Sequence, residues 1–245
     1  MIVLYTDFGG NGPYVGQLKA VLVQAAPSVP VMDLMHELPV FEHKAAAYLL
    51  AALVDELPPG AVVLGVVDPG VGRTDRRPVV MRADGRWFVG PDNGLFAVIA
   101  KHAGASEWWE ITWRPKRLSN TFHGRDLFAP VAAMLARGEP VPGDPFDPDD
   151  AVGMHWPDDF GEVIYIDHYG NAMTGIRAST LPSDASLEVR DVSIRQARTF
   201  SDVGVGEPIW YENSCGLVEI AMNKADAANQ MGLRVGTHVL AVALA

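Results

Sequence analysis

The feature that most limits how this chain can fold is a short apolar stretch, residues 62–67, which reads VVLGVV and ends at Asp68. A strand that is apolar on both faces is typical of the interior of a parallel sheet, where helices cover the two faces. The surrounding segments alternate between strand-like and helix-like patterns, which predicts an α/β layered domain. The predicted strands are residues 2–6, 29–34, 62–67, 79–82 and 87–89, and the predicted helices are residues 14–26, 41–57, 94–102 and 126–137.

The amino-acid composition of the sequence changes after residue 138. Residues 139–153 hold several prolines and acidic residues, a composition that supports neither a helix nor a central strand. We therefore expect an N-terminal α/β domain with a mostly parallel sheet over residues 1–138, a linker over 139–153 and a smaller C-terminal domain over 154–245. Short strand-like runs in the C-terminal part predict a small barrel or sandwich. These runs are residues 162–166, 186–189, 192–194, 208–211, 217–221 and 238–242, with one helix at residues 225–232.

The composition argues against several classes of function. The chain has 245 residues, of which 49% are apolar and 20% charged, as in a packed globular protein rather than a disordered one. Its net charge is −11 and it contains no basic stripe, which argues against a nucleic-acid partner. The longest apolar run, residues 45–54, is too short to cross a membrane, so we expect no membrane partner. The single cysteine, Cys215, excludes an intrachain disulfide and is compatible with a cytoplasmic location.

Four short motifs stand at predicted strand ends or turns, where an open α/β sheet binds its ligands. Asp7 and Asp68 each follow a predicted strand, so we expect both to face one crevice. The simpler interpretation is that each aspartate caps the next helix or fixes a turn. The motifs are Thr6-Asp7-Phe8-Gly9; Asp68-Pro69-Gly70-Val71-Gly72; Pro91-Asp92-Asn93-Gly94 together with Thr121-Phe122-His123-Gly124-Arg125-Asp126; and Asp167-His168-Tyr169-Gly170-Asn171.

Several familiar kinds of site are excluded by spacing. The glycines after the first strand stand at positions 10, 12 and 16, which does not match a dinucleotide-binding loop. His36, Glu37 and His43 lack the spacing of a zinc protease, and no other set of His and Cys residues suggests a metal site. A Gly-x-Ser-x-Gly elbow is also missing from the sequence. We therefore expect neither a metal nor a cofactor.

Taken together, the motifs resemble those of the S-adenosylmethionine hydroxide adenosyltransferases, a family related to the fluorinases and chlorinases. The match covers nearly the whole chain in family order and extends into residues 214–221. The resemblance implies an N-terminal α/β domain and a C-terminal β-barrel domain. It also implies a homotrimer that binds S-adenosylmethionine between the N-terminal domain of one subunit and the C-terminal domain of the next.

The resemblance further implies hydrolysis of S-adenosylmethionine to adenosine and L-methionine, by attack of water-derived hydroxide on C5′ of the ribose. The catalytic residues of the family fall on Asp68, Arg76 and His123; Arg73 is the alternative arginine, because the loop at residues 72–77 is one residue longer than usual. Water is a poor nucleophile, with a pKa of about 15.7. His123, held by a hydrogen-bonding network that includes Asp68, could take its proton. The sequence leaves open which of the three residues is the base.

Other positions match family residues that bind the substrate. A carboxylate is an acceptor-only group and suits the ribose hydroxyls, and an acidic site suits a substrate with a sulfonium and an ammonium group. The matching positions are Asp7 for the ribose, Asp167 and Ser214 for the amino and carboxyl ends of the methionine part, and Asn171 with the backbone near Asn223 and Lys224 for adenine.

Two alternatives to a hydrolase, a halogenase and a non-catalytic binding protein, agree less well with these residues. A halogenase of the same fold would carry tyrosine at the position of Asp68, and tyrosine then serine at the positions of His123 and Gly124, so this sequence favours water as the nucleophile. A non-catalytic protein that binds adenosine or S-adenosylmethionine would need no base over C5′. The positions that depart from the family pattern bear on substrate affinity more than on the catalytic set; they are Gly12, Met173, Gly175 and Cys215.

Overall fold

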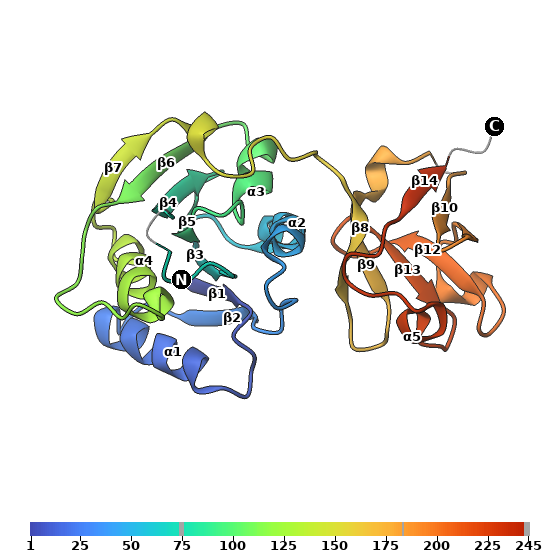
Figure 1. Ribbon diagram of the computed structural model, residues 1–245, viewed down its shortest axis with the longest axis horizontal. Helices are drawn as coiled ribbons and strands as arrows, with labels where there is room; N and C mark the ends of the chain where they lie inside the picture. Colours follow the sequence, from blue (N-terminus) through green and yellow to red (C-terminus); the bar gives the residue numbers. More distant parts are fainter. Residues whose placement is uncertain (74–75, 183, 243–245) are drawn as a thin grey trace. The chain divides into compact units, whose positions relative to one another are not determined.

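The N-terminal half of the chain folds around a seven-stranded sheet (Figure 1) in a computed structural model that describes residues 1–73, 76–182 and 184–242. Its strands are β1 (Ile2–Thr6), β2 (Val31–Met35), β3 (Val62–Val66), β4 (Pro78–Ala83), β5 (Arg86–Pro91), β6 (Ser106–Ile111) and β7 (Gly143–Phe146). They lie in the order β2-β1-β3-β5-β4-β6-β7. The first three neighbouring pairs are parallel and the last three antiparallel, so all strands except β4 and β7 point in one direction. The predicted α/β class with a mostly parallel sheet is confirmed.

The central position of β3 determines where the loops gather. All five of its residues are buried, as its unbroken apolar character predicts. Its register pairs Val66 with Thr6 of β1, and β5 runs parallel on its other side. The carboxyl ends of these strands therefore lie at one edge of the sheet. Asp7 and Asp68 follow β1 and β3 at this edge, which is where ligands bind in sheets of this kind.

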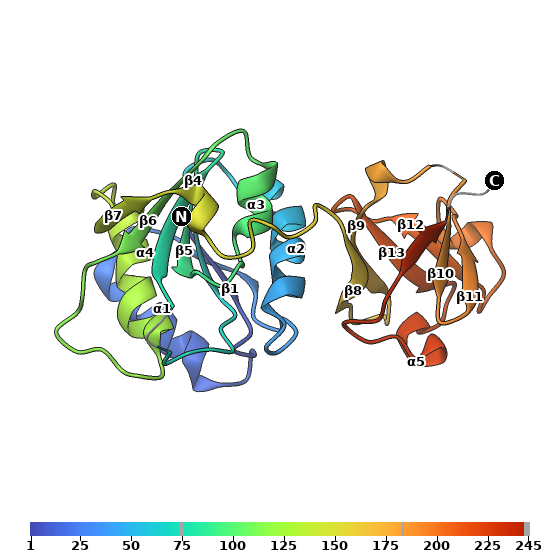
Figure 2. The ribbon, with the colours of Figure 1, turned by 45° about the horizontal axis from the view of Figure 1, so that its top comes forward.

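Helices cover both faces of the sheet (Figure 2). Leu4 of β1 lies in the core formed with α1 and α4, whereas the hydroxyl of the next residue, Tyr5, donates to the carbonyl of Ala46 in α2. Successive side chains of a strand point to opposite faces, so α1 and α4 lie on one side and α2, packed with α3, on the other. Within the described residues, no helix combines the length and apolar character needed to cross a membrane. The helices are α1 (Pro13–Ala25), α2 (His43–Leu53), α3 (Ala97–His102) and α4 (Ala129–Ala136), with short turns η1 (Val54–Glu56), η2 (Gly124–Phe128) and η3 (Pro148–Asp150).

The C-terminal half contains two antiparallel sheets that are bridged at both ends. Its strands are β8 (Phe160–Ile166), β9 (Ala172–Arg177), β10 (Ser186–Val189), β11 (Val192–Arg195), β12 (Pro208–Glu212), β13 (Leu217–Met222) and β14 (Leu240–Val242), with η4 (Ala178–Thr180), η5 (Phe200–Asp202) and α5 (Ala227–Met231). The sheets have the orders β11-β10-β14 and β12-β13-β9-β8. Gln196, after β11, pairs with Trp210 of β12, and Glu162 of β8 pairs with His238, just before β14. These bridges close the strands into a ring around a core that includes the buried Trp210, in agreement with the predicted barrel.

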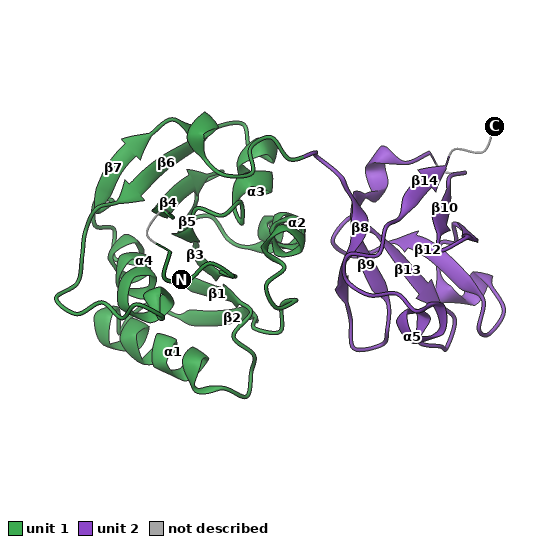
Figure 3. Ribbon diagram, viewed as in Figure 1, with its two compact units in different colours: residues 1–156 green, residues 157–245 purple. Residues whose placement is uncertain are grey.

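The chain divides into two compact units, residues 1–156 and 157–245 (Figure 3). Residues 139–153, expected to form a linker, instead belong to the first unit, because β7 pairs with β6 and extends the sheet. Pro145 is tolerated in β7 because this strand lies at the edge of the sheet. The sequence-based prediction also lacks β6 and β9; in β9 the central Gly175 weakens the strand pattern.

Candidate active site

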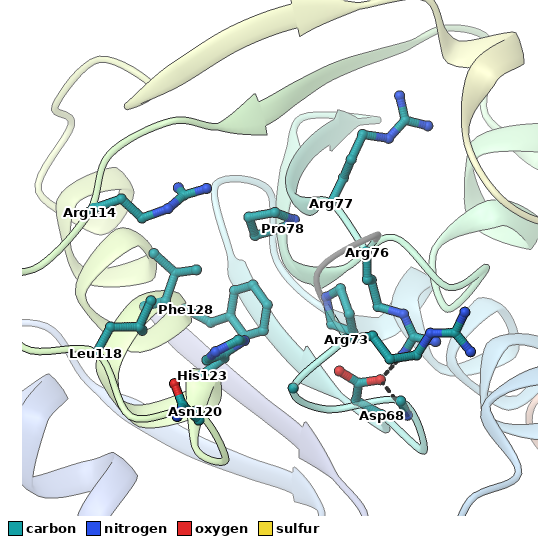
Figure 4. A pocket seen from close by; sticks show the side chains of 14 residues that line it. Asp68, Arg73, Arg76, Arg77, Pro78, Arg114, Leu118, Asn120, His123 and Phe128 are labelled. Carbon is teal, nitrogen blue, oxygen red and sulfur yellow. Dashed lines mark hydrogen bonds and ion pairs between the residues drawn. The ribbon is translucent and has the colours of Figure 1, made fainter.

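A cavity of about 300 Å³ lies in the first unit where β3 ends (Figure 4). Asp68, Arg76 and His123, singled out from the sequence, line it together. They come from the loop after β3, the segment just before β4 and the residue before η2. Arg73, the alternative arginine, lines the same cavity, and residues 74–75 between the two arginines lie outside the described residues. A volume of this size is sufficient for a small-molecule group.

Asp68 and Arg76 are in direct contact. Nη1 of Arg76 forms an ion pair with Oδ1 of Asp68, and the two side chains are only 20% and 8% exposed. The same carboxylate oxygen accepts the backbone N–H of Gly70 at 3.0 Å. Burial lowers the pKa of Arg76, and the nearby carboxylate of Asp92 opposes this effect. A guanidinium keeps its charge in proteins, so the pair holds a fixed cation at the cavity wall.

The glycine at position 70 leaves room for this ion pair. A Cβ atom added to Gly70 would lie 2.5 Å from Nη2 of Arg76 and 2.8 Å from its Cζ. Any side chain at this position would therefore require the guanidinium to shift. The Asp-Pro-Gly motif thus supplies both the carboxylate and a glycine whose backbone lets the Arg76 guanidinium come close.

His123 stands at a junction between a loop and a helix. It directly precedes η2, a single turn of π-helix that leads into α4, and such turns are frequent at functional sites. Asp126 fixes the loop before it, accepting the N–H of Ser119 at 2.8 Å and two N–H groups of Arg125. Among the described residues, the Asp68 carboxylate is bonded to Arg76 and to the N–H of Gly70, and no direct bond joins it to the ring of His123. The network expected between the two side chains stays a prediction. His123 is one of the residues that line the cavity.

The side chains of Asp92 and Asn93 support the site rather than supply its chemistry. Nδ2 of Asn93 donates to the carbonyl of Val67 at 2.7 Å, directly before Asp68. Asp92 accepts from Nε of Arg77 at 3.1 Å and pairs with its Nη2 at 2.9 Å. The carboxylates here are paired with arginines, and within the described residues no three His, Cys, Asp or Glu side chains gather as a metal ion would require.

Asp7 lies at the same sheet edge but is not among the residues that line this cavity. Its Oδ2 accepts the backbone N–H of Phe41 at 3.5 Å. Burial raises the pKa of Asp7, and the hydrogen bond from Phe41 opposes the shift. When ionised, this carboxylate is an acceptor for hydroxyl groups of a ligand.

A larger cavity of about 810 Å³ lies in the second unit and gathers four of the predicted substrate contacts, Asp167, Asn171, Ser214 and Lys224. Asp167 follows β8 and accepts the main-chain N–H of Asn171 at 2.8 Å and its side-chain amide at 2.9 Å. These bonds order the turn between β8 and β9. The second unit therefore presents polar side chains from two turns to one hollow.

The structure shows where Asn223, Met173 and Gly175 lie relative to the second cavity. Asn223 is a predicted adenine contact, and the other two are departures from the family pattern. Nδ2 of Asn223 donates to the carbonyl of Val203 at 2.8 Å, and Asn223 does not line the second cavity. Met173 does line it. A Cβ added to Gly175 would lie 2.6 Å from Cβ of Phe160, so a larger residue would not fit here unless Phe160 moved.

Sequence reasoning missed three residues that line the second cavity, Tyr211, Asn213 and Glu219. The hydroxyl of Tyr211 donates to Oε1 of Glu219, and Nδ2 of Asn213 donates to Oε2 at 2.8 Å. Burial raises the pKa of Tyr211, and the bond to Glu219 adds to the shift, so the hydroxyl keeps its proton. The signal available in the sequence was the single carboxyl in the apolar run LVEIAM of β13.

Comparison with known proteins places both units in one family. The SAM hydroxide adenosyltransferase N-terminal domain matches residues 2–143, and the C-terminal domain of the same name matches residues 161–240. A protein from Thermus thermophilus named (R)-S-adenosyl-L-methionine hydrolase is 41% identical, over 97% of this chain and 98% of that protein. A fluorinase from Actinopolyspora mzabensis is 27% identical, over 98% and 96%. The crystal structure of an uncharacterized conserved protein from Thermotoga maritima is similar with a TM-score of 0.89 and 34% identity, covering 99% of this chain and 100% of that one.

The raised pKa of Asp7 predicts how its replacement affects stability. Above this pKa the buried charge destabilises the folded state, whereas at acid pH the carboxyl is neutral in both states. Asp7→Asn should therefore unfold at a higher denaturant concentration than the wild type at neutral pH. The difference should shrink as the pH falls below the pKa of Asp7 in the folded protein, and disappear below the ordinary pKa that Asp7 has in the unfolded chain.

Asp33→Asn is the control with the opposite sign. Burial raises the pKa of Asp33, but hydrogen bonds from Lys19 and His36 bring it below its ordinary value. Its replacement should lower the unfolding midpoint at neutral pH, and the loss should disappear in acid. A midpoint difference for Asp7→Asn that does not change with pH would contradict the assignment.

Proposed function

The chain belongs to the SAM hydroxide adenosyltransferase family, and from this premise we propose that it hydrolyses S-adenosyl-L-methionine to adenosine and L-methionine. The observation that carries the proposal is the convergence of Asp68, Arg76 and His123 on one cavity. The name of the Thermus thermophilus relative specifies the (R) form. We therefore take the (R) sulfonium epimer as the substrate.

The proposed reaction has one difficult partner, the water molecule. The oxygen of water attacks C5′ as the bond from C5′ to sulfur breaks, and the electron pair leaves with sulfur as the neutral thioether of methionine. No acid is needed at sulfur, but water has a pKa of about 15.7 and needs a base. A positioned base contributes about 10²–10⁴-fold. Holding the water molecule in line behind C5′ removes its translational freedom, which supplies much of the remaining rate enhancement.

The contacts within the first cavity favour His123 as the base. One oxygen of Asp68 already accepts from Arg76 and from the N–H of Gly70, whereas the ring of His123 has no protein partner among the described residues. The proton of water passes to a ring nitrogen of His123. Arg76, held by Asp68, stabilises the developing hydroxide as a preorganised cation.

The remaining contacts are assigned by chemistry and by family position. Asp7 accepts from the ribose hydroxyls, and Asp167 and Ser214 hold the amino and carboxyl ends of the methionine part. Asn171 and the backbone near Lys224 contact adenine, with the backbone of Asn223 as a further contact. Asp167, Asn171, Ser214 and Lys224 share one cavity, which supports their joint assignment.

The proposal includes a homotrimer in the cytoplasm. The proposed catalytic residues belong to residues 1–156, whereas most of the proposed substrate contacts belong to residues 157–245. We propose that each substrate is held by the first unit of one subunit and the second unit of the next. The lone Cys215 suits a reducing compartment.

The activity itself is tested by product analysis with both sulfonium epimers, with and without chloride. We expect adenosine and methionine in equal amounts from the (R) epimer, and no dependence on chloride. In water enriched in oxygen-18, the label should enter the 5′ hydroxyl of adenosine, because water attacks C5′. A 5′-chlorinated nucleoside would indicate a halogenase, and unchanged ligand retained on the protein would indicate a binding protein.

The catalytic assignment predicts unequal effects of the two arginines. Arg76→Ala should lower kcat by about 10²–10³-fold, and His123→Ala should lower it by about 10²–10⁴-fold, because charge stabilisation and the base are lost. Both variants should bind adenosine with affinity close to that of the wild type, measured by calorimetry. Arg73→Ala, the matched control in the same cavity, should lower kcat by less than about tenfold. The reverse order of the two arginine variants would reassign the role to Arg73.

The shared site is tested by mixing two defective subunits. His123→Ala and Asp167→Ala proteins, each of low activity, are unfolded, mixed and refolded. Random assortment in a cyclic trimer would rebuild about a quarter of the sites from two intact surfaces, so hydrolysis should return. Mixed trimers without activity, or a monomer in sedimentation experiments, would contradict the proposal.

A further inference from the structure

Glu219 occupies an unusual position for a carboxylate. It lies in β13 (Leu217–Met222), whose six residues are all buried, and it is itself only 3% exposed. Its side chain nevertheless lines the larger cavity of the second unit. Carboxylates are almost never this deeply buried unless they are paired. The question is therefore what balances its charge.

Among the described residues, the side chains that bond to Glu219 are neutral. Oε1 accepts from the hydroxyl of Tyr211, and Oε2 accepts from Nδ2 of Asn213 at 2.8 Å. In the described part of the chain, no Lys, Arg or His forms an ion pair with Glu219. Elsewhere in the same unit, Asp159 has two hydrogen bonds from Arg177, at 2.8 and 2.9 Å. Burying a carboxylate without a cation is costly, so this arrangement leaves a place for a positive charge from the ligand.

The charged residues that line the cavity are mainly negative, like Glu219 itself. Asp167, Glu219 and Asp226 line it, against one cation, the exposed Lys224. A cleft lined mainly by one sign of charge concentrates ligands of the opposite sign. The charge of Asp167 also contributes to the raised pKa of Tyr211, in keeping with its position near the Tyr211–Glu219 pair.

The hydrogen bonds of Asn213 connect Glu219 to the turn that carries Ser214. While Nδ2 of Asn213 donates to Glu219, its Oδ1 accepts the N–H groups of Cys215 at 2.9 Å and Leu217 at 3.0 Å. Glu219 and Ser214 are thus held on one wall by a single amide side chain. A ligand carboxylate at Ser214 would have its α-ammonium group within reach of this wall.

We propose that Glu219 is a specificity-determining residue, whose buried carboxylate provides the countercharge for the ammonium group of an amino-acid ligand, alongside Asp167. This proposal rests on the proposed function, because it takes the methionine part of the substrate to lie at Ser214. It explains why a strand of the barrel core carries a carboxyl. It also makes the site select nucleosides with a cationic amino-acid side chain over neutral nucleosides.

The test compares three ligands in the His123→Ala protein, which turns over substrate slowly. Calorimetry gives Kd for S-adenosylmethionine, for S-adenosylhomocysteine, which lacks the sulfonium charge but keeps the ammonium, and for adenosine, which has neither. Adding Glu219→Gln should weaken the binding of S-adenosylmethionine and S-adenosylhomocysteine by about 10- to 100-fold. It should change the affinity for adenosine by less than about threefold. Glu188→Gln, which removes the same charge from β10 outside the cavity, should change none of the three.

Two outcomes would overturn the proposal. Equal weakening of all three ligands would mean that Glu219 only shapes the cavity, and unchanged affinity for S-adenosylmethionine would mean that its charge plays no part. If wild-type protein hydrolyses the substrate and the Glu219→Gln affinities are unchanged, this inference alone fails. If the wild type neither binds nor hydrolyses S-adenosylmethionine, the proposed function fails as well.

A second variant covers the case in which Glu219→Gln does not fold. Met173 lies directly opposite Glu219 on β9 and lines the same cavity. Met173→Lys would supply a cation from the protein and should reduce the preference for S-adenosylhomocysteine over adenosine by about tenfold or more. Met173→Gln, of similar length and neutral, should leave that preference in place. The same loss in both variants would overturn the electrostatic explanation.

Discussion

The burial of β3 on both faces is the constraint on which the rest of the structure depends. Because Val62–Val66 cannot face water on either side, helices must cover the sheet above and below, and the neighbouring strands β1 and β5 run parallel to it. Polar groups are then left to the ends of the strands. Asp68 follows β3 at the carboxyl edge, and the cavity with Arg76 and His123 forms there.

The carboxylates near the two cavities differ in their partners. In the first unit Asp68 is paired with Arg76 and Asp92 with Arg77, so the cavity wall carries cations whose positions are fixed by carboxylates. In the second unit Glu219 is bonded to neutral groups. Fixed cations suit the stabilisation of a developing hydroxide, whereas an uncompensated carboxylate suits a cationic ligand. Under the proposed function, the first cavity performs the chemistry and the second selects the substrate.

Hydrophobic periodicity predicts the helices and strands with a clear apolar pattern. It fails where pairing with a neighbouring strand forms a strand despite an unfavourable composition. The apolar strands of the parallel part and the helices beside them were predicted within a few residues. The composition around Pro145 predicts a linker at β7, yet an edge strand needs only one set of ladder bonds and tolerates proline. β9 was missed because Gly175 interrupts its pattern, although the backbone of β8 approaches closely at that position and requires a glycine.

The sequence by itself determined the α/β class, the order of the motifs and the residue types at the candidate site, because hydrophobic periodicity and local motifs are properties of short segments. Only the tertiary structure decided which side chains meet. Asp68 contacts Arg76 rather than His123, Asn223 turns toward Val203, and Glu219 reaches a cavity from inside a core strand. These contacts depend on strand register and on the path of loops between distant segments, and a linear pattern contains neither.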